Sequence, residues 1–227
     1  MIKFLPLLLG LAYGYVMLRF SAAQSSKALK AQSQPMRDAD LQALVDRLAQ
    51  ALELPAIGVN IYEIAAVNGL AAHDGQIYLT RGFLQRRERG EVSNEELAAV
   101  IAHELGHVAL GHSRRRMVDF SGQNAVFMML STLLNRFLPG IGVLLARGIS
   151  SVLMARLSRR DEFEADAYAS ALLVKAGIGI GPQISLFQKL GRLTGSDGSS
   201  VPAWVRSHPK TDERIAAIQA RAARWQI

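Results

Sequence analysis

Two histidines four residues apart are the first sign of chemistry in this chain. His103 and His107 stand in the run HELGH. On a helix, residues at this spacing project from the same face, so the two imidazoles can share one metal ion. Glu104 stands where the pattern HExxH places a carboxylate that takes a proton from water without binding the metal. The spacing therefore predicts a metal-dependent hydrolytic site.

The next histidine does not supply the third ligand. The extended pattern HExxHxxGxxH needs a glycine and a histidine at positions that Leu110 and Ser113 occupy here. His112 is off register for the face that would share the metal, and we predict that it lies at the helix end or on the surface. Because the sequence has no cysteine, any metal must be held by nitrogen and oxygen ligands.

A second acidic motif offers the missing ligand. Glu162 and Asp166 are four residues apart in DEFEAD and share one face of a predicted helix. Glu162 can complete a site of two histidines and one carboxylate, and Asp166 can orient a ligand histidine by accepting its remaining N–H. We predict one Zn²⁺ per chain, bound by His103, His107 and Glu162.

Helices dominate the elements that must position these residues. Ser93 and Glu96 form a capping-box pattern, so the helix that carries both histidines should begin at Asn94 and run through His112. Apolar spacing and end signals predict further helices from about residue 38, as a pair within 125–157, over 158–177, and from Thr211 onward.

A small sheet should accompany the helices. Residues 57–62 alternate apolar and polar side chains, and a second extended run at 76–80 follows a stretch that contains glycine. We predict that these strands pair antiparallel. The expected fold class is therefore α+β, mainly helical, with a small antiparallel sheet beside the helix of HELGH.

The N-terminal end is typical of a membrane segment. Residues 4–18 are apolar and uncharged, and basic residues on both sides can snorkel toward the headgroups. We predict a single membrane anchor over 1–20, with a cleaved signal segment as the alternative. A flexible linker over 21–37 would then lead to one folded domain over 38–227.

The region between the two motifs is unusually apolar. Residues 125–157 are interrupted by charged residues and by Pro139 and Gly140, which favours two amphipathic helices packed on the core over a membrane span. A membrane-apposed hairpin and a cover over a cleft are the alternatives. The net charge of +7 suits an anionic membrane surface, but no basic stripe with interleaved aromatic residues is present, so we expect no nucleic-acid partner.

Three motifs in order make the chain resemble a known family. HELGH, then SRRDEFEADAYA, then SHPKTDERI resemble metallopeptidase family forty-eight, the gluzincins that include HtpX, the CAAX prenyl endopeptidases and the Oma-type proteases. The resemblance covers about residues 38–227 and implies a zincin-like metalloprotease domain. Its pattern of HExxH plus ExxxD falls on His103, Glu104, His107, Glu162 and Asp166.

The resemblance implies roles for residues outside these motifs. His208 of the HPxxxxRI element would stabilise the oxyanion or occupy the open position of the metal in a resting form. An extended substrate would pair with an edge strand within 75–84, near Asn68. A single anchor is similar to the compact bacterial members, which implies the inner membrane with the domain in the periplasm, or secretion to the periplasm if the segment is cleaved.

Two functions follow from these motifs. The first is a zinc endopeptidase with protein or peptide substrates, in which Glu104 is the base; the resemblance implies quality control of membrane or envelope proteins. The second is a membrane-tethered, chaperone-like binding module whose zinc site is structural or plugged. Residues 125–157 and His208 could both keep substrate from the metal in that case.

Overall fold

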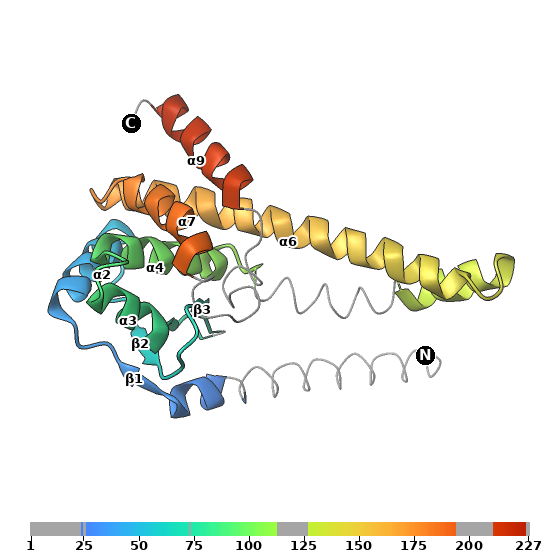
Figure 1. The fold of residues 1–227 in the computed structure, drawn as a ribbon, viewed down its shortest axis with the longest axis horizontal. Helices are drawn as coiled ribbons and strands as arrows, with labels where there is room; N and C mark the ends of the chain where they lie inside the picture. Colours follow the sequence, from blue (N-terminus) through green and yellow to red (C-terminus); the bar gives the residue numbers. More distant parts are fainter. Residues whose placement is uncertain (1–23, 25, 73, 113–126, 194–210, 226–227) are drawn as a thin grey trace, which may run out of the picture.

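The computed structural model describes residues 24, 26–72, 74–112, 127–193 and 211–225. Most of them are helical and surround one small sheet (Figure 1). This confirms the α+β, mainly helical fold class. The predicted anchor over 1–20 and His208 lie outside the described residues.

Helix α4 (Asn94–Ala109) is the central element of the fold. Its predicted capping box is present: the Ser93 hydroxyl accepts a hydrogen bond from the Glu96 N–H, and the Glu96 carboxylate accepts one from the Ser93 N–H. Helices α2 (Ala39–Ala51), α6 (Gly142–Lys175) and α7 (Gly181–Leu193) pack around it. The residues of α4 from Glu96 to His107 are all buried, so its HELGH run lies inside the domain.

Two of the remaining helices begin where the sequence predicts, whereas α7 and the helix that follows the sheet are not predicted from the sequence. Asp38 caps α2 by accepting a hydrogen bond from the Leu41 N–H, and the apolar residues of α2 enter the core beside α4. Helix α3 (Arg81–Glu88) follows the sheet directly. The last helix, α9 (Thr211–Trp225), begins at the predicted residue and packs against α6 and α7.

Helix α6 differs from the sequence prediction in its length. It runs unbroken over 34 residues, whereas the sequence predicted one helix ending at 157 and another beginning at 158. No proline falls within it, so nothing in the sequence breaks the helical backbone. The change from mostly apolar to mostly charged side chains near residue 158 is a change of side chains within one continuous helix. One rigid helix therefore joins the apolar hairpin to the DEFEAD motif.

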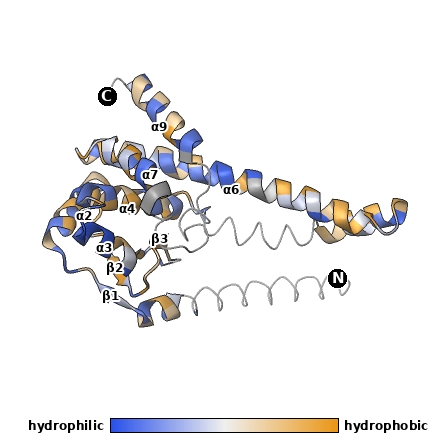
Figure 2. Cartoon of the chain, in the orientation of Figure 1, coloured by the Kyte–Doolittle hydropathy of each residue, from blue (hydrophilic) through white to orange (hydrophobic). Residues whose placement is uncertain are grey.

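The apolar hairpin projects from the domain. Residues 127–137 are helical, and the chain turns at 138–141 into α6 (Figure 1). Many of its large apolar side chains are exposed. The prediction that this region packs on the core is therefore wrong. Figure 2 shows hydrophobic residues around this far end of α6. Among the described residues, none of the helices combines the length and the hydropathy needed to cross a bilayer.

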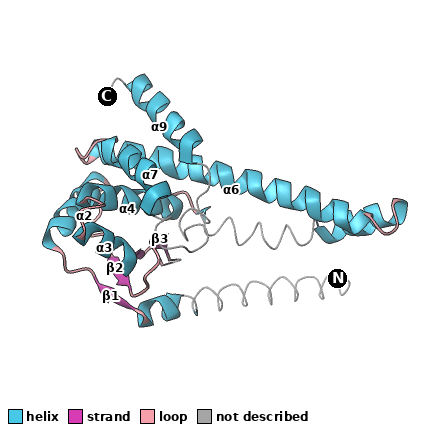
Figure 3. Ribbon diagram, in the orientation of Figure 1, coloured by secondary structure: helices cyan, strands magenta, loops and turns pink. Residues whose placement is uncertain are grey.

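The sheet is mixed, so the predicted antiparallel pairing of 57–62 with 76–80 is wrong. Strands β2 (Val59–Tyr62) and β4 (Ile77–Thr80) pair in parallel. The stretch between them, expected to be a connection, contains β3 (Gly69–Ala71), which pairs antiparallel with β4. The strand order is β1-β2-β4-β3. Figure 3 shows the short strands in magenta among the much longer helices. A three-residue strand is too short to produce an alternating pattern, which is why the sequence did not reveal it.

Strand β1 (Ser33–Pro35) lies inside the range predicted to be a flexible linker. It pairs antiparallel with β2, with Ser33 opposite Tyr62. Part of this range therefore belongs to the folded domain. Its neighbour in the sheet, β2, is an inner strand whose Val59 and Ile61 side chains belong to the hydrophobic core.

Candidate metal centre

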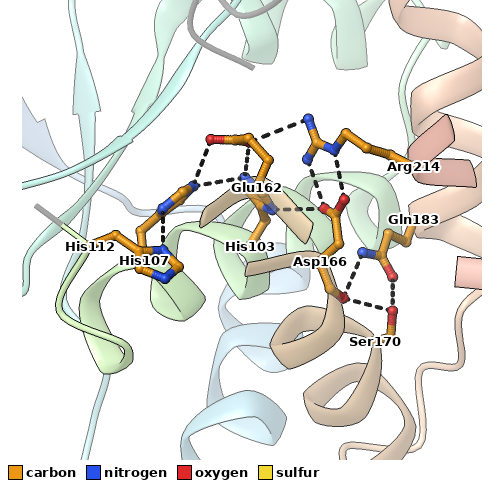
Figure 4. A network of polar contacts seen from close by, with 8 residues as sticks. All are labelled: His103, His107, His112, Glu162, Asp166, Ser170, Gln183 and Arg214. Carbon is orange, nitrogen blue, oxygen red and sulfur yellow. Dashed lines mark hydrogen bonds and ion pairs between the residues drawn. The ribbon is translucent and has the colours of Figure 1, made fainter. Parts of the chain in front are cut away.

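The structure brings together the three residues that the sequence singled out as ligands. His103 and His107 come from α4, and Glu162 comes from α6 (Figure 4). The Nε2 atoms of the two histidines are 3.1 Å apart. Glu162 places Oε2 3.4 Å from His103 Nε2 and Oε1 3.5 Å from His107 Nε2. Two helices distant in sequence thus bring the ligand atoms of three residues together.

The separations of these atoms fit a zinc ion. Two atoms bound to one zinc at about 2.0–2.2 Å in tetrahedral geometry lie roughly 3.3–3.6 Å apart, and the three separations here are 3.1, 3.4 and 3.5 Å. The three side chains therefore have the spacing to hold one zinc ion together. All three side chains are almost fully buried, so the site can hold an ion away from bulk water.

Asp166 holds His103 from the side opposite the metal position. Its Oδ1 lies 3.0 Å from His103 Nδ1, so Nε2 is the nitrogen that points toward Glu162 and His107. Such a carboxylate fixes the tautomer and the orientation of a ligand imidazole. Ser170 and Gln183 bond the backbone carbonyl of Asp166, which keeps this part of α6 in place.

A buried arginine from α9 completes the cluster. The Arg214 guanidinium donates to both oxygens of Asp166, at 2.6 and 2.7 Å, and lies 3.4 Å from Glu162 Oε2. It also stacks over the Phe187 ring at 4.5 Å. Arg214 is 1% exposed. Its charge compensates one buried carboxylate and leaves the second to be balanced by another cation.

The pKa values of the cluster express the same charge balance. Burial alone would lower the pKa of His103, but hydrogen bonds to Asp166 and Glu162 outweigh it and raise the pKa to about 9. Burial would raise the pKa of Asp166, yet the bonds from Arg214 and His103 hold it below its usual value. Without a metal, a proton on His103 therefore supplies positive charge at the place where an ion would supply it.

His112 is a supporting residue. It lies just beyond the end of α4, which is one of the two predicted positions, but it is fully buried and not at the surface. Its Nδ1 lies 2.9 Å from Nδ1 of His107, and its Nε2 lies 3.2 Å from Glu164 and 3.8 Å from Asp161 (Figure 4 shows the histidine pair). The contact to His107 is the counterpart of the contact between Asp166 and His103.

Strand β3 lies directly against the face of α4 that carries Glu104. A Cβ atom at Gly69 would stand 2.4 Å from Val100 Cγ1 and 3.6 Å from Glu104 Cγ, so only glycine allows this approach. The sequence placed the edge strand within 75–84, but β4 is an inner strand; of the two edge strands, β1 and β3, it is β3 that contacts α4. Asn68 immediately precedes β3, and its backbone exchanges hydrogen bonds with the Thr80 hydroxyl.

Gly106 sets the distance between the two ligand-bearing helices. A Cβ there would lie 3.0 Å from the carbonyl oxygen of Ala165 and 3.3 Å from Tyr168 Cβ. These distances are tighter than ordinary contacts, so the glycine lets α4 and α6 pack closely. Because Gly106 immediately precedes His107 and Ala165 immediately precedes Asp166, this close contact lies beside the candidate metal centre.

Known proteins resemble this chain over most of its length. Residues 35–222 match peptidase family M48. The chain belongs to peptidase family M48. The metalloprotease LoiP of Escherichia coli (strain K12) is 29% identical over 188 residues, which cover 80% of this chain and 69% of LoiP. The metalloprotease YcaL of the same organism is 29% identical over 172 residues, which cover 74% of this chain and 63% of YcaL.

The protease HtpX of Pseudomonas aeruginosa (strain LESB58) is 27% identical over 207 residues, which cover 75% of this chain and 68% of HtpX. The family suggested by the three motifs is thus confirmed, and it supports a metallopeptidase. Sequence reasoning named the three converging side chains and Asp166, but it assigned no role to Arg214 or His112. The position of Arg214 in the HPxxxxRI element was the one signal for it.

Proposed function

We propose that this chain is a zinc-dependent endopeptidase whose ion is held by His103, His107 and Glu162. The observation that carries the proposal is the convergence of three buried side chains, whose nitrogen and oxygen atoms approach one another to between 3.1 and 3.5 Å. A Zn²⁺ ion bound there would act as a Lewis acid that polarises the scissile carbonyl and lowers the pKa of water. Membership of family M48 supports the same chemistry.

Glu104 is the proposed base. It is buried, directly follows His103, and lies where β3 crosses α4. Its carboxylate takes a proton from the attacking water and passes it to the leaving amine nitrogen as the peptide C–N bond breaks. Asp166 and Arg214 keep His103 oriented during this transfer. His208, from the HPxxxxRI element, is proposed to stabilise the oxyanion of the carbonyl.

The proposed substrate is an extended protein segment. Among the described residues β3 is an edge strand, and it lies beside Glu104, so a segment that paired with it would pass next to the base. We propose membrane or envelope proteins as the natural substrates. The anchor over 1–20 would hold the domain of 38–227 at the bacterial inner membrane, on its periplasmic side.

A substitution of the base tests the peptidase directly. We expect Glu104→Gln to keep its zinc and its fold but to lose cleavage of casein, because only the proton transfer is removed. Glu95→Gln, an exposed position in the first turn of the same helix, is the matched control and should cleave normally. Undiminished cleavage by the Glu104 variant would refute the assigned base.

The near-complete burial of the three ligand residues also suits the chaperone-like alternative, in which the ion is structural. A wild-type chain that binds unfolded casein but never cleaves it, with or without a zinc chelator, would establish that alternative. Cleavage that stops when a chelator removes zinc and returns when zinc is restored would exclude it.

A further inference from the structure

The hairpin that joins the two motif helices exposes more apolar surface than a folded domain ordinarily leaves in water. It consists of helical residues 127–137, the turn at 138–141 and the first part of α6. Phe137 and Leu144 are each 70% exposed. Other large apolar side chains exposed in this hairpin are Met128, Met129, Leu133, Leu138, Ile141, Val143, Leu145, Ile149 and Val152. A contiguous apolar surface of this kind marks a binding surface.

The exposed residues surround α6 instead of forming one stripe. Between Gly142 and Val152 the buried residues are Gly142, Ala146 and Ser150, which follow one another at intervals of about one turn. Val143 lies on one side of them and Ile149 on the other, while Leu144 lies on the far face. A protein partner covers one face of a helix, whereas a helix that is apolar on most sides is typical of a lipid environment.

The charge of the hairpin is of one sign. Residues 127–160 contain no aspartate, glutamate or lysine, and their charged residues are Arg136, Arg147, Arg156, Arg159 and Arg160. Arg160 pairs with Glu164, and the other four are exposed. Exposed arginines next to apolar side chains favour a surface rich in anionic lipid headgroups. The two arginines closest to the tip have stems long enough to snorkel.

We propose that this hairpin inserts its apolar tip into one leaflet of an anionic bilayer. From Gly142 to Val152 the helix rises about 15 Å, which matches half of the ~30 Å hydrocarbon layer. Arg156 and Arg159 follow one and two turns later, at the depth of the headgroups. The hairpin enters the membrane and does not cross it, which agrees with the lack of a membrane-crossing helix among the described residues.

The insertion has a consequence for the metal centre. Because α6 is unbroken, Glu162 stands ten residues beyond Val152, ~15 Å further along an upright helix. The centre would then lie just outside the headgroup layer, where it can reach protein segments that emerge from the membrane. The insertion itself does not depend on the proposed peptidase chemistry, so either can fail without the other.

A fluorescent label at the tip tests the insertion. The chain has no cysteine, so Leu144→Cys in the full-length protein gives a unique site for an environment-sensitive dye. Leu54→Cys is the matched control, since Leu54 is an exposed leucine just after α2, away from the hairpin. With phosphatidylglycerol vesicles, we expect the dye at 144 to shift to the blue, to be quenched by nitroxide-labelled acyl chains and to be protected from iodide. The dye at 54 should show none of these changes.

A charge variant tests the lipid class. Arg156→Gln with Arg159→Gln should lower the preference of the tip for phosphatidylglycerol over phosphatidylcholine, and its metal content should stay unchanged. Equal insertion of the unsubstituted hairpin into both lipids would overturn the anionic part of the proposal. Iodide quenching at 144 as strong as that at 54 in the presence of vesicles would overturn insertion. A blue shift without lipid that grows with protein concentration would assign the surface to a second copy and would also overturn it.

Discussion

Replacing Arg214 by glutamine would leave the buried Asp166 carboxylate without its strongest partner. The guanidinium now donates to both oxygens of Asp166 and lies near Glu162. It also holds the pKa of Asp166 low, against the effect of burial. The substitution removes one member of a buried ion pair and leaves the other as an uncompensated buried charge, which strongly lowers the stability of the fold.

The loss of stability should be large. Removing one partner of a buried pair costs about 3–5 kcal/mol. For a chain of this size, about 1 kcal/mol corresponds to a Tm change of roughly 2–4 °C, so we expect a Tm lower by roughly 6–20 °C. The double variant Arg214→Gln with Asp166→Asn should recover part of this loss, because it removes the uncompensated charge as well.

Thermal unfolding of the metal-free protein, followed by circular dichroism, measures the effect. Arg224→Gln is the matched control, since Arg224 lies in the same helix but is exposed. We expect it to shift the Tm by less than about 2 °C, as surface substitutions usually do. An Arg214 variant as stable as this control would refute the view that the buried ion pair of Arg214 and Asp166 holds α9 against α6.

Three further predictions follow from the neighbours of the ligands. His112→Ala should weaken zinc affinity about tenfold or more in a chelator competition, and His112→Asn should restore part of it, because a supporting hydrogen bond orients a metal-bound imidazole; equal affinities would contradict this role. The metal-free protein should lose stability as the pH rises through about 9, because the proton on His103 contributes fully below its unfolded pKa of 6.5 and is lost at its raised folded pKa. Zinc should abolish this dependence in thermal melts, and a flat profile without zinc would contradict the assigned pKa. Gly106→Ala should cost about 1–3 kcal/mol in urea unfolding through overpacking, whereas Gly148→Ala, which meets open space, should cost nothing; the reverse order would contradict the close helix packing.

The local part of the site could be predicted from the sequence. The period of the helix places His103 and His107 on the same face, and the capping box of Ser93 and Glu96 indicates where that helix begins. The contribution of Glu162 followed from the ligand chemistry, since a carboxylate is the remaining option in a chain without cysteine. These inferences depend only on residues that are close in the chain and on which residue types can bind a metal.

The remaining parts depend on geometry that spacing does not contain. His112 lies beyond Gly111, whose φ of +66° turns the chain out of the helix, so helical register no longer sets the direction of the histidine. Arg214 reaches Asp166 across a separation of 48 residues, and this pairing depends on how α9 docks. The connection between the parallel strands β2 and β4 contains the short strand β3, which is too short to show a pattern of its own in the sequence.

Zinc content after dialysis tests the central claim most directly. We expect one zinc per chain in the full-length wild-type protein and in Glu104→Gln, and none in a Glu162→Gln variant whose circular dichroism spectrum shows a folded chain. That result would mean that the carboxylate from α6 joins the two histidines of α4 in holding the ion. A folded Glu162→Gln variant that retains one zinc with wild-type affinity would contradict the account.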